Sequence, residues 1–410
     1  MTGPTVSDLT RVFGRIGLLS FGGPAAQIAL MHKELVEDRP WLTERQYLNA
    51  LSFCMLLPGP EAMQLATYAG WRLHGTRGGL IAGLLFVLPG AVVILALASA
   101  YATYGSVSWV AAAFLGIKAT VIVIVIQALL KLSRRALTRP VAYALALAAF
   151  VAIFALSVPF PLIILAAALI GALALRGAPQ QAPPLTTSPT RTLGTIVLWA
   201  TFWLAPLLGL WLFAPDLLSD IALFFATLAL VTFGGAYAVL AYMVQEVVQG
   251  YGWLTTDQMI DALGLAETTP GPLILVTQFV GFLAGAQAGG WGMGFTAAII
   301  TLWVTFVPCF LWIFAGAPYV EWVATRPRLT GALNGITAAV VGVIANLSVW
   351  FALNVWFDAG TFAPEAFDPV ALALSALAAI LLLWRKWDLL AVLPLMATAG
   401  ITASIFAGLI

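Results

Sequence analysis

Charged residues are scarce in this 410-residue chain. They make up 9% of it, against about a quarter in soluble domains, while 62% of the residues are hydrophobic and the mean hydropathy is +1.02. The apolar runs are long and continuous, which excludes the alternating strands of a membrane barrel. The composition therefore predicts an all-α polytopic membrane protein with lipid as its surroundings.

Residues for several kinds of chemistry are also missing. The two cysteines, Cys54 and Cys309, lie in apolar runs, and neither a disulfide framework nor a metal site is expected from them. The chain has no phosphate-binding loop, zinc motif, nucleophile elbow or cofactor fingerprint. The net charge is +1 and no basic tail is present, so nucleic acid is not an expected partner. The polar start of the chain predicts no cleavable signal peptide. We expect neither an enzyme nor a cofactor-binding protein.

Proline and glycine, by contrast, stand at two matched places. Pro58-Gly59-Pro60 is followed by Glu61, and Pro270-Gly271-Pro272 is preceded by Glu267 in the sequence Glu267-Thr268-Thr269. Proline removes a backbone donor and clashes with the preceding turn, so each triplet is expected to break a helix into two half-helices. In lipid, such a break is tolerated where protein or a watery cavity satisfies the freed backbone groups. A matched pair of broken helices indicates a transporter's binding site.

These triplets belong to an internal repeat with a constant offset in residue number. Phe21-Gly22-Gly23 matches Phe233-Gly234-Gly235, which sets the offset at 212 (233 − 21), and Trp41-Leu42-Thr43 matches Trp253-Leu254-Thr255 in the same register. Later the offset becomes 219, where Pro89 matches Pro308 and Gly116-Ile117 matches Gly335-Ile336, which implies seven inserted residues near 285–294. The Phe-Gly-Gly triplets are either further breaks that line the site or places of close helix packing.

We expect about 13 membrane segments in two halves. A first repeat at 1–176 has six, a Pro-, Gln- and Thr-rich linker at 177–191 precedes one extra span at 192–213, and a second repeat at 214–410 has six. The first two segments are expected at Ser7–Val36 and at Thr43–His74, where Thr43 and Gln46 form a capping box. An odd number of spans separates equivalent points, so the second half is expected to be inverted.

The basic residues predict which way the chain faces. Most of the 18 Lys and Arg fall on one side, which the positive-inside rule makes cytoplasmic together with the N-terminus. This assignment puts Lys33, Arg39 and Arg45 on the outer side. It also puts the Glu246–Asp261 loop inside, although this loop has no Lys or Arg.

A helix that begins just after a break offers unpaired N–H groups and about half a positive charge. Two such ends, at Pro60–Gln64 and Pro272–Val276, would form an anion site if they met near the membrane midplane. The alternative is that the triplets only kink helices for packing. The candidate binding residues are the break residues and their polar neighbours: Gly22, Gly23, Pro58, Gly59, Pro60, Glu61, Gln64, Lys118, Gly234, Gly235, Thr268, Thr269, Pro270, Gly271 and Pro272.

Three charges inside apolar runs are candidates for function because charge is costly in a membrane. Glu61 and Glu267 are candidate proton carriers. Glu61 follows its break, where the helix dipole favours the negative form, and Glu267 precedes its break, where the dipole disfavours it. Each carboxylate could instead be an ordinary helix-terminus charge. Lys118 lies well inside a span, and it would either contact an anion or pair with Glu61 or Glu267.

The duplicated Phe-Gly-Gly, Trp-Leu-Thr and Pro-Gly-Pro motifs resemble the chromate ion transporter family in its long two-domain type, over about Leu9 to Leu390. The resemblance implies a multi-pass protein of the bacterial inner membrane with antiparallel halves. It also implies export of chromate driven by the membrane gradient, and chromate resistance. The second half departs from the motif, since Ala236 follows Gly235 and Leu273 holds the place of Glu61. The two halves are therefore not expected to be equivalent.

The function expected from these observations is proton-coupled secondary transport of a tetrahedral oxyanion, with chromate first and sulfate as its near isostere. Such a transporter is expected to be an antiporter, although the sequence does not determine the coupling ion. A transporter of sulfate or another anion stays open as an alternative, as do a non-transporting membrane scaffold and an intramembrane enzyme. The direction of flux and the oligomeric state, including a homo-oligomer, are not determined by the sequence.

Overall fold

A computed structural model describes residues 4–175, 188–233, 236–320, 322, 326–357 and 364–407. Most of the linker at 177–191 and both Gly234 and Gly235 lie outside the described residues. The first part of the chain forms α1 (Val6–Leu19), α2 (Gly23–His32), η1 (Lys33–Glu37), α3 (Glu44–Cys54), α4 (Glu61–Tyr104), α5 (Ser108–Ala136), α6 (Pro140–Phe154), α7 (Phe160–Ala174) and α8 (Pro189–Phe213).

The second part repeats this pattern with variations. It forms α9 (Asp216–Val231), α10 (Ala236–Val244), η2 (Gln245–Gly250), α11 (Thr256–Glu267), η3 (Leu273–Leu275), α12 (Val276–Gly316), η4 (Ala317–Tyr319), α14 (Pro327–Trp356), η6 (Pro364–Ala366), α15 (Pro369–Ala379), η7 (Ile380–Trp384) and α16 (Leu389–Phe406). The predicted capping box at Thr43 and Gln46 is confirmed, and its repeat equivalents Thr255 and Gln258 form the same box.

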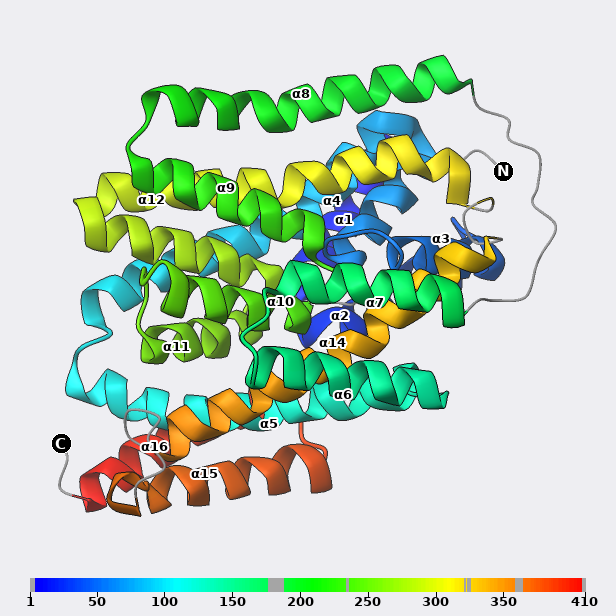
Figure 1. The fold of residues 1–410 in the computed structure, drawn as a ribbon. Helices are drawn as coiled ribbons and strands as arrows, with labels where there is room; N and C mark the ends of the chain where they lie inside the picture. Colours follow the sequence, from blue (N-terminus) through cyan, green and yellow to red (C-terminus); the bar gives the residue numbers. More distant parts are fainter. Residues whose placement is uncertain are drawn as a thin grey trace.

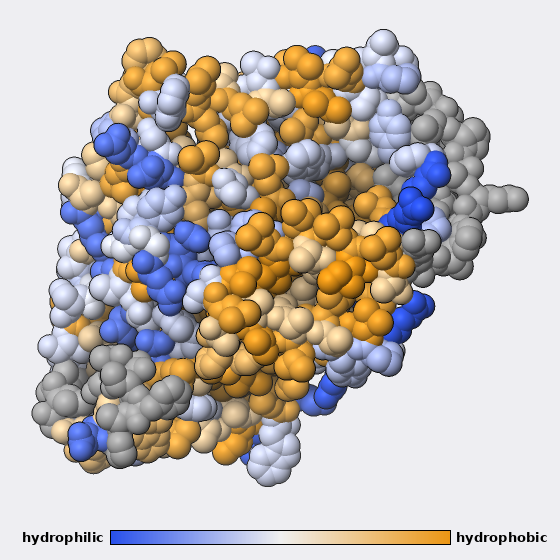
Figure 2. Space-filling view, in the orientation of Figure 1, coloured by the Kyte–Doolittle hydropathy of each residue, from blue (hydrophilic) through white to orange (hydrophobic). Residues whose placement is uncertain are grey.

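The all-α polytopic membrane fold is confirmed. Within the described residues, six helical segments are long and apolar enough to cross a bilayer: Glu61–Tyr104, Ser108–Ala136, Pro189–Phe213, Leu273–Tyr319, Pro327–Trp356 and Leu389–Phe406. Large apolar side chains such as Leu147, Leu173 and Trp211 are exposed. Figure 2 shows apolar residues across the middle of one face and hydrophilic residues toward its two ends, the distribution that a bilayer requires.

Both predicted Pro-Gly-Pro breaks are present, and the Phe-Gly-Gly triplet of the first half is a break as well. Gly22 and Gly23 have φ values of +82° and +76°, a left-handed conformation that glycine adopts without strain. The stretch expected as one span at Ser7–Val36 is therefore two helices. Arg15 of α1 lies 3.6 Å from Glu34 of η1, so the chain turns back after Gly22 and does not cross.

The same return occurs at the second expected segment. Nε2 of His74 lies 2.7 Å from the carbonyl oxygen of Pro4, so the short arm of α4 ends beside the start of α1. Figure 1 places α3 at this end too, near the N-terminus. Two membrane segments were expected in this part of the chain. The first corresponds to α1 and α2, and the second to α3 and the part of α4 before His74. Each of them enters and leaves at the same end of the molecule.

This corrects the expected sides of two loops, the one that carries Lys33, Arg39 and Arg45 and the Glu246–Asp261 loop. Lys33, Arg39 and Arg45 lie at the same end as His74, not at the opposite one. In the second half, Figure 1 shows α11 toward the end that carries the C-terminus, so the Glu246–Asp261 loop is also on the other side from the one expected. The loop without Lys or Arg is therefore opposite the basic end, which removes the one disagreement with the positive-inside rule.

Two long helices turn sharply and then cross the molecule. α4 turns at His74 and Gly75, and α12 turns at Gly289 and Gly290. The second residue of each pair, Gly75 or Gly290, has a positive φ (+61° and +77°). The turns differ in residue number by 215 (290 − 75), a value between the offsets of 212 and 219. The seven inserted residues thus add about one helical turn to each arm of α12, which keeps the same helix faces in contact.

Candidate functional site

The two halves meet where their broken helices cross. The amide of Gly59 donates to the carbonyl oxygen of Thr232 at 2.9 Å, and the amide of Gly271 donates to that of Ser20, also at 2.9 Å. Gly59 and Gly271 are repeat equivalents, and so are Ser20 and Thr232. Each Pro-Gly-Pro corner is thus held by the residue that precedes the Phe-Gly-Gly triplet of the opposite half. Protein groups here satisfy backbone that lipid could not.

The two corners share one small cavity of about 10 Å³. It is lined by Gly59, Pro60, Glu61 and Ala62 from the first corner, Pro272, Leu273 and Ile274 from the second, and Pro24, Gln27 and Thr232 from the neighbouring breaks. The half-helices that start at Glu61 and Leu273 therefore present their N-terminal ends to the same space. The space has room for about one water molecule, so an oxyanion would enter it only after a rearrangement.

Two buried glutamines complete the corners. Nε2 of Gln27 donates to the carbonyl of Gly271 at 2.6 Å, and Nε2 of Gln64 donates to the carbonyl of Pro58 at 2.7 Å. Among the described residues, the amide oxygen of each has no hydrogen-bond partner. Buried polar atoms are rarely left unpaired because desolvation is costly. These oxygens mark the crossing as a place where a further polar group would be stabilised.

A larger cavity of about 430 Å³ reaches the first corner from one end of the molecule. Gly59 and Glu61 belong to its inner wall, and Arg135 and Arg139 lie at its exposed part. Its lining consists of Ser52, Cys54, Met55, Leu56, Leu57, Gly59, Glu61, Leu132, Arg135, Ala136, Thr138, Arg139, Ala142, Leu175, Leu333, Asn334 and Thr337. We call this cavity the vestibule. α5 returns to the end where His74 lies, so the vestibule opens at the N-terminal end.

Lys118 lies on the opposite side of the crossing and is paired. Its Nζ is 2.6 Å from Oδ1 of Asp257 and 3.7 Å from Oδ1 of Asp261, and the hydroxyl of Tyr101 donates to Oδ2 of Asp261 at 2.7 Å. The expected partners Glu61 and Glu267 are not the ones it contacts. At the offset of 219, Lys118 is the counterpart of Thr337 in the vestibule. The structure therefore brings Lys118 together with α11, and not with the shared corner cavity.

The other candidate side chains near the second corner, those of Glu267, Thr268 and Thr269, form hydrogen bonds with nearby protein groups. Glu267 is buried, and the hydroxyl of Tyr237 donates to its Oε1 at 2.8 Å. The hydroxyls of Thr268 and Thr269 donate to carbonyls of their own helix, at 2.7 and 2.8 Å. None of these three side chains lines the vestibule or the corner cavity.

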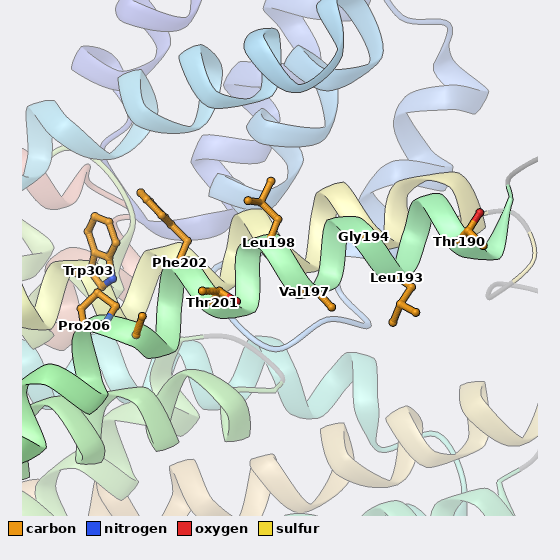
Figure 3. Close-up of a pocket in the computed structure, with 10 residues that line it drawn as sticks. Thr190, Leu193, Gly194, Val197, Leu198, Thr201, Phe202, Pro206 and Trp303 are labelled. Atoms are coloured by element: carbon orange, nitrogen blue, oxygen red, sulfur yellow. The ribbon is translucent and has the colours of Figure 1, made fainter.

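A further hollow of about 910 Å³ lies between α8 and α12 (Figure 3). Thr190, Leu193 and Val197 of α8 line it, with Trp303 of α12 at its far end, and its lining has no charged side chain. α8 lies at the edge of the molecule in Figure 1, where its apolar face meets lipid. Because this hollow is apolar and no break residue lines it, we place the candidate site at the crossing and its vestibule.

Several residues of this site were not found by sequence reasoning. Ser20 and Thr232 match at the offset of 212 and directly precede the Phe-Gly-Gly triplets, which was a usable signal. Gln27 was a polar residue in an apolar run. Arg135 and Arg139 were assigned only to topology, because their approach to Glu61 depends on how α5 packs in the fold.

Comparisons with known proteins identify the family of the chain. A family model described as "Chromate transporter" matches residues 7–172 and 219–402. A "Probable chromate transport protein" of Synechococcus elongatus is 33% identical over 364 residues, which is 87% of either chain. A "Chromate transport protein" of Cupriavidus metallidurans is 30% identical over 93% of this chain and 89% of its own. An "Uncharacterized transporter" of Methanocaldococcus jannaschii is 25% identical over 97% of this chain and 94% of its own.

No solved structure matches the chain. The family match covers both halves and includes both Pro-Gly-Pro corners and the residues that hold them. The chain therefore belongs to the chromate transporter family.

Proposed function

We propose that this protein is a secondary active transporter that exports a tetrahedral oxyanion, chromate, across a bacterial inner membrane. The observation that carries the proposal is the crossing of the two Pro-Gly-Pro corners around one cavity that is continuous in its lining with the vestibule through Gly59 and Glu61. The printed names of the relatives from Synechococcus and Cupriavidus support chromate as the substrate. Sulfate has the same shape and charge.

In this proposal the oxyanion is held between the N-terminal ends that begin at Glu61 and Leu273. Backbone N–H groups and helix dipoles favour an anion there without a formal positive charge. The residues proposed around it are those of the breaks, with Gln64 beside the first corner. Gly234 and Gly235, which lie outside the described residues, are included because they are the repeat equivalents of Gly22 and Gly23. Rocking of one repeat against the other would expose the site alternately to the two sides.

Proton coupling is assigned to Glu61 and Glu267. Glu61 lines both cavities, so its negative form would repel an entering dianion and its protonated form would admit it. Glu267 is buried against Tyr237, where an isolated charge is costly. Protonation of either carboxylate would therefore change with the side to which the site is open. Lys118 is proposed as the anion's positive neighbour when the opposite side opens, because it is the counterpart of Thr337.

The orientation follows from the basic end of the molecule. Arg72, Arg77, Arg135 and Arg139 lie at the end where the vestibule opens, so the positive-inside rule makes this end cytoplasmic. The conformation described here would then be open toward the cytoplasm, as a transporter that collects its substrate there requires.

The direct test is chromate uptake by inside-out vesicles or proteoliposomes with an imposed pH gradient. We expect uptake above that of protein-free liposomes, and a rate that depends on the gradient. Glu267→Gln should make the remaining transport insensitive to the gradient. Uptake equal to that of protein-free liposomes at several pH values would contradict the proposed function. Uptake that is unaffected by any pH gradient, in the wild type, would contradict the proton coupling alone.

A further inference from the structure

Two arginines face the vestibule, and neither forms an ion pair with a carboxylate of the described residues, although Glu61 lines the same cavity. Arg135 ends α5 and Arg139 precedes α6, and both line the vestibule and are exposed in it. No described Asp or Glu lies within 4 Å of either guanidinium. Nη2 of Arg135 reaches only Sδ of Met55, a weak acceptor, at 3.1 Å.

A few other basic side chains of the described residues have partners, although most of them, including Lys131 and Arg134 of α5, form no ion pair either. Arg15 and Arg39 pair with Glu34, and Lys118 pairs with Asp257 and Asp261. Arg326 lies over the ring of Trp322, at 4.0 Å from its centroid. What sets Arg135 and Arg139 apart is that they line the vestibule. Within the described part of the chain, the Arg139 guanidinium has no acceptor and that of Arg135 has only Met55, so their donors are available to a solute.

We propose that Arg135 and Arg139 form a capture site for the oxyanion in the vestibule, with the amide of Asn334 as a further donor. The proposal rests on the proposed function and assigns residues that bind the substrate before it reaches the crossing. A guanidinium presents a planar fork of donors that matches two oxygens of an oxyanion. Two of them carry the charge that a dianion requires.

The geometry of the route supports a separate site at this point. The vestibule has a volume of about 430 Å³, whereas the shared corner cavity beyond Glu61 has about 10 Å³. In this conformation an oxyanion can therefore advance to Glu61 and no further. An anion bound next to the carboxylate of Glu61 is stable only if positive charge lies near it as well. Arg135 and Arg139 provide this charge in the vestibule.

The repeat shows that these donors belong to the first half alone. α5 begins at Ser108 and α14 at Pro327, which again gives an offset of 219 (327 − 108). At this offset Arg135 corresponds to Asn354, and Arg139 corresponds to Asp358, which lies outside the described residues. The second half thus has no guanidinium group at either equivalent position. This asymmetry favours anion binding from the side of the vestibule, while the gradients across the membrane set the direction of net transport.

The test measures initial chromate uptake against concentration in inside-out vesicles, for the wild type, Arg135→Gln, Arg139→Gln and the double variant. Loss of a charge-assisted hydrogen bond should raise KM about tenfold for each single variant, with the maximal rate near that of the wild type. The lysine variants should fall between the wild type and the glutamine variants. Arg134→Gln is the control, because it removes the same charge from the same helical turn outside the vestibule, and its KM should not change.

A double variant whose KM stays within about twofold of the wild type, in vesicles where the wild type transports chromate, would overturn the capture site and leave the proposed function intact. Wild-type vesicles without uptake would contradict the proposed function. In that case equilibrium binding of sulfate to the purified protein decides the capture site. Binding weakened by Arg135→Gln and Arg139→Gln but not by Arg134→Gln supports it, and unchanged or absent binding overturns it. Should a glutamine variant fail to fold, the lysine variants give the same comparison.

Discussion

The amide nitrogen of Gly59 lies 2.9 Å from the carbonyl oxygen of Thr232, which belongs to the opposite half of the chain. The equivalent bond between Gly271 and Ser20 has the same length. Each repeat therefore cannot complete its own broken helix and depends on the other repeat for it. This mutual dependence explains why the two halves cross at the corners, and why the cavity between them is lined by both.

Glycine is required at both corners. Gly59 has φ of +114° and Gly271 of +86°, and a Cβ at position 59 would lie 2.8 Å from Nε2 of Gln64 and 3.0 Å from Sγ of Cys309. We predict that Gly59→Ala and Gly271→Ala each lower the stability by about 1–3 kcal/mol and abolish chromate uptake. Thermal unfolding in detergent measures the first effect, and vesicle uptake measures the second.

The control for these variants is Gly14→Ala, since Gly14 lies in α1 and a Cβ there meets no atom within 4 Å. Its stability should stay unchanged or rise by up to about 1 kcal/mol. If Gly59→Ala unfolded at the same temperature as Gly14→Ala and still transported, the corners would not need their left-handed glycines.

The pair of Lys118 with Asp257 and Asp261 gives a second prediction. Lys118→Gln should destabilise the protein by about 1–3 kcal/mol, because the buried carboxylate of Asp261 loses its positive partner while Asp257 stays mostly exposed. Lys118→Gln combined with Asp261→Asn should recover much of the loss, which a double-mutant cycle in thermal unfolding measures.

Transport by this double variant separates two roles of Lys118. If Lys118 contacts the anion in the other conformation, the double variant should be stable and yet slow in chromate uptake. A double variant that is both stable and fully active would show that the cluster serves structure only.

The turning back of α1–α2 gives a third prediction, about accessibility. In a Cys54→Ser, Cys309→Ser background, Asp38→Cys and Thr76→Cys should react with an impermeant thiol reagent from the same side of the membrane, since positions 38 and 76 lie at one end. Ser106→Cys, after α4 has crossed, should react from the other side. Labelling of Asp38→Cys together with Ser106→Cys would show that the first segment crosses after all.

Much of this architecture could be predicted from the sequence. Composition indicated the membrane class, and the offset of 212 paired the corners, because repeats preserve local geometry. The odd number of spans between equivalent points predicted inverted halves. The first apolar stretch could not be assigned correctly by length alone. Ser7–Val36 is long enough to cross, and the turn back shows only in the structure, from the positive φ of Gly22 and Gly23 and the contact of Arg15 with Glu34.

The sequence predicted the helix breaks at the centre of the candidate site, but not the residues that surround them. Breaks such as Pro58-Gly59-Pro60 are local events, so the sequence reveals them. The partners of Lys118, by contrast, come from α11, far along the chain, and no spacing rule connects them. Arg135 looked like a topology signal because the sequence gives the number of charges at a helix end but not the cavity that they face.

The central claim is that an oxyanion lodges along the path from Arg135 to the crossed corners. Its most direct test is anomalous diffraction from crystals of the protein soaked in chromate, which locates chromium atoms without reference to any mechanism. We predict a chromium peak in the vestibule beside Arg135 and Arg139, or between Glu61 and Leu273 if the corners have opened. Chromium confined to the outer surface, with both positions empty at saturating chromate, would contradict the claim.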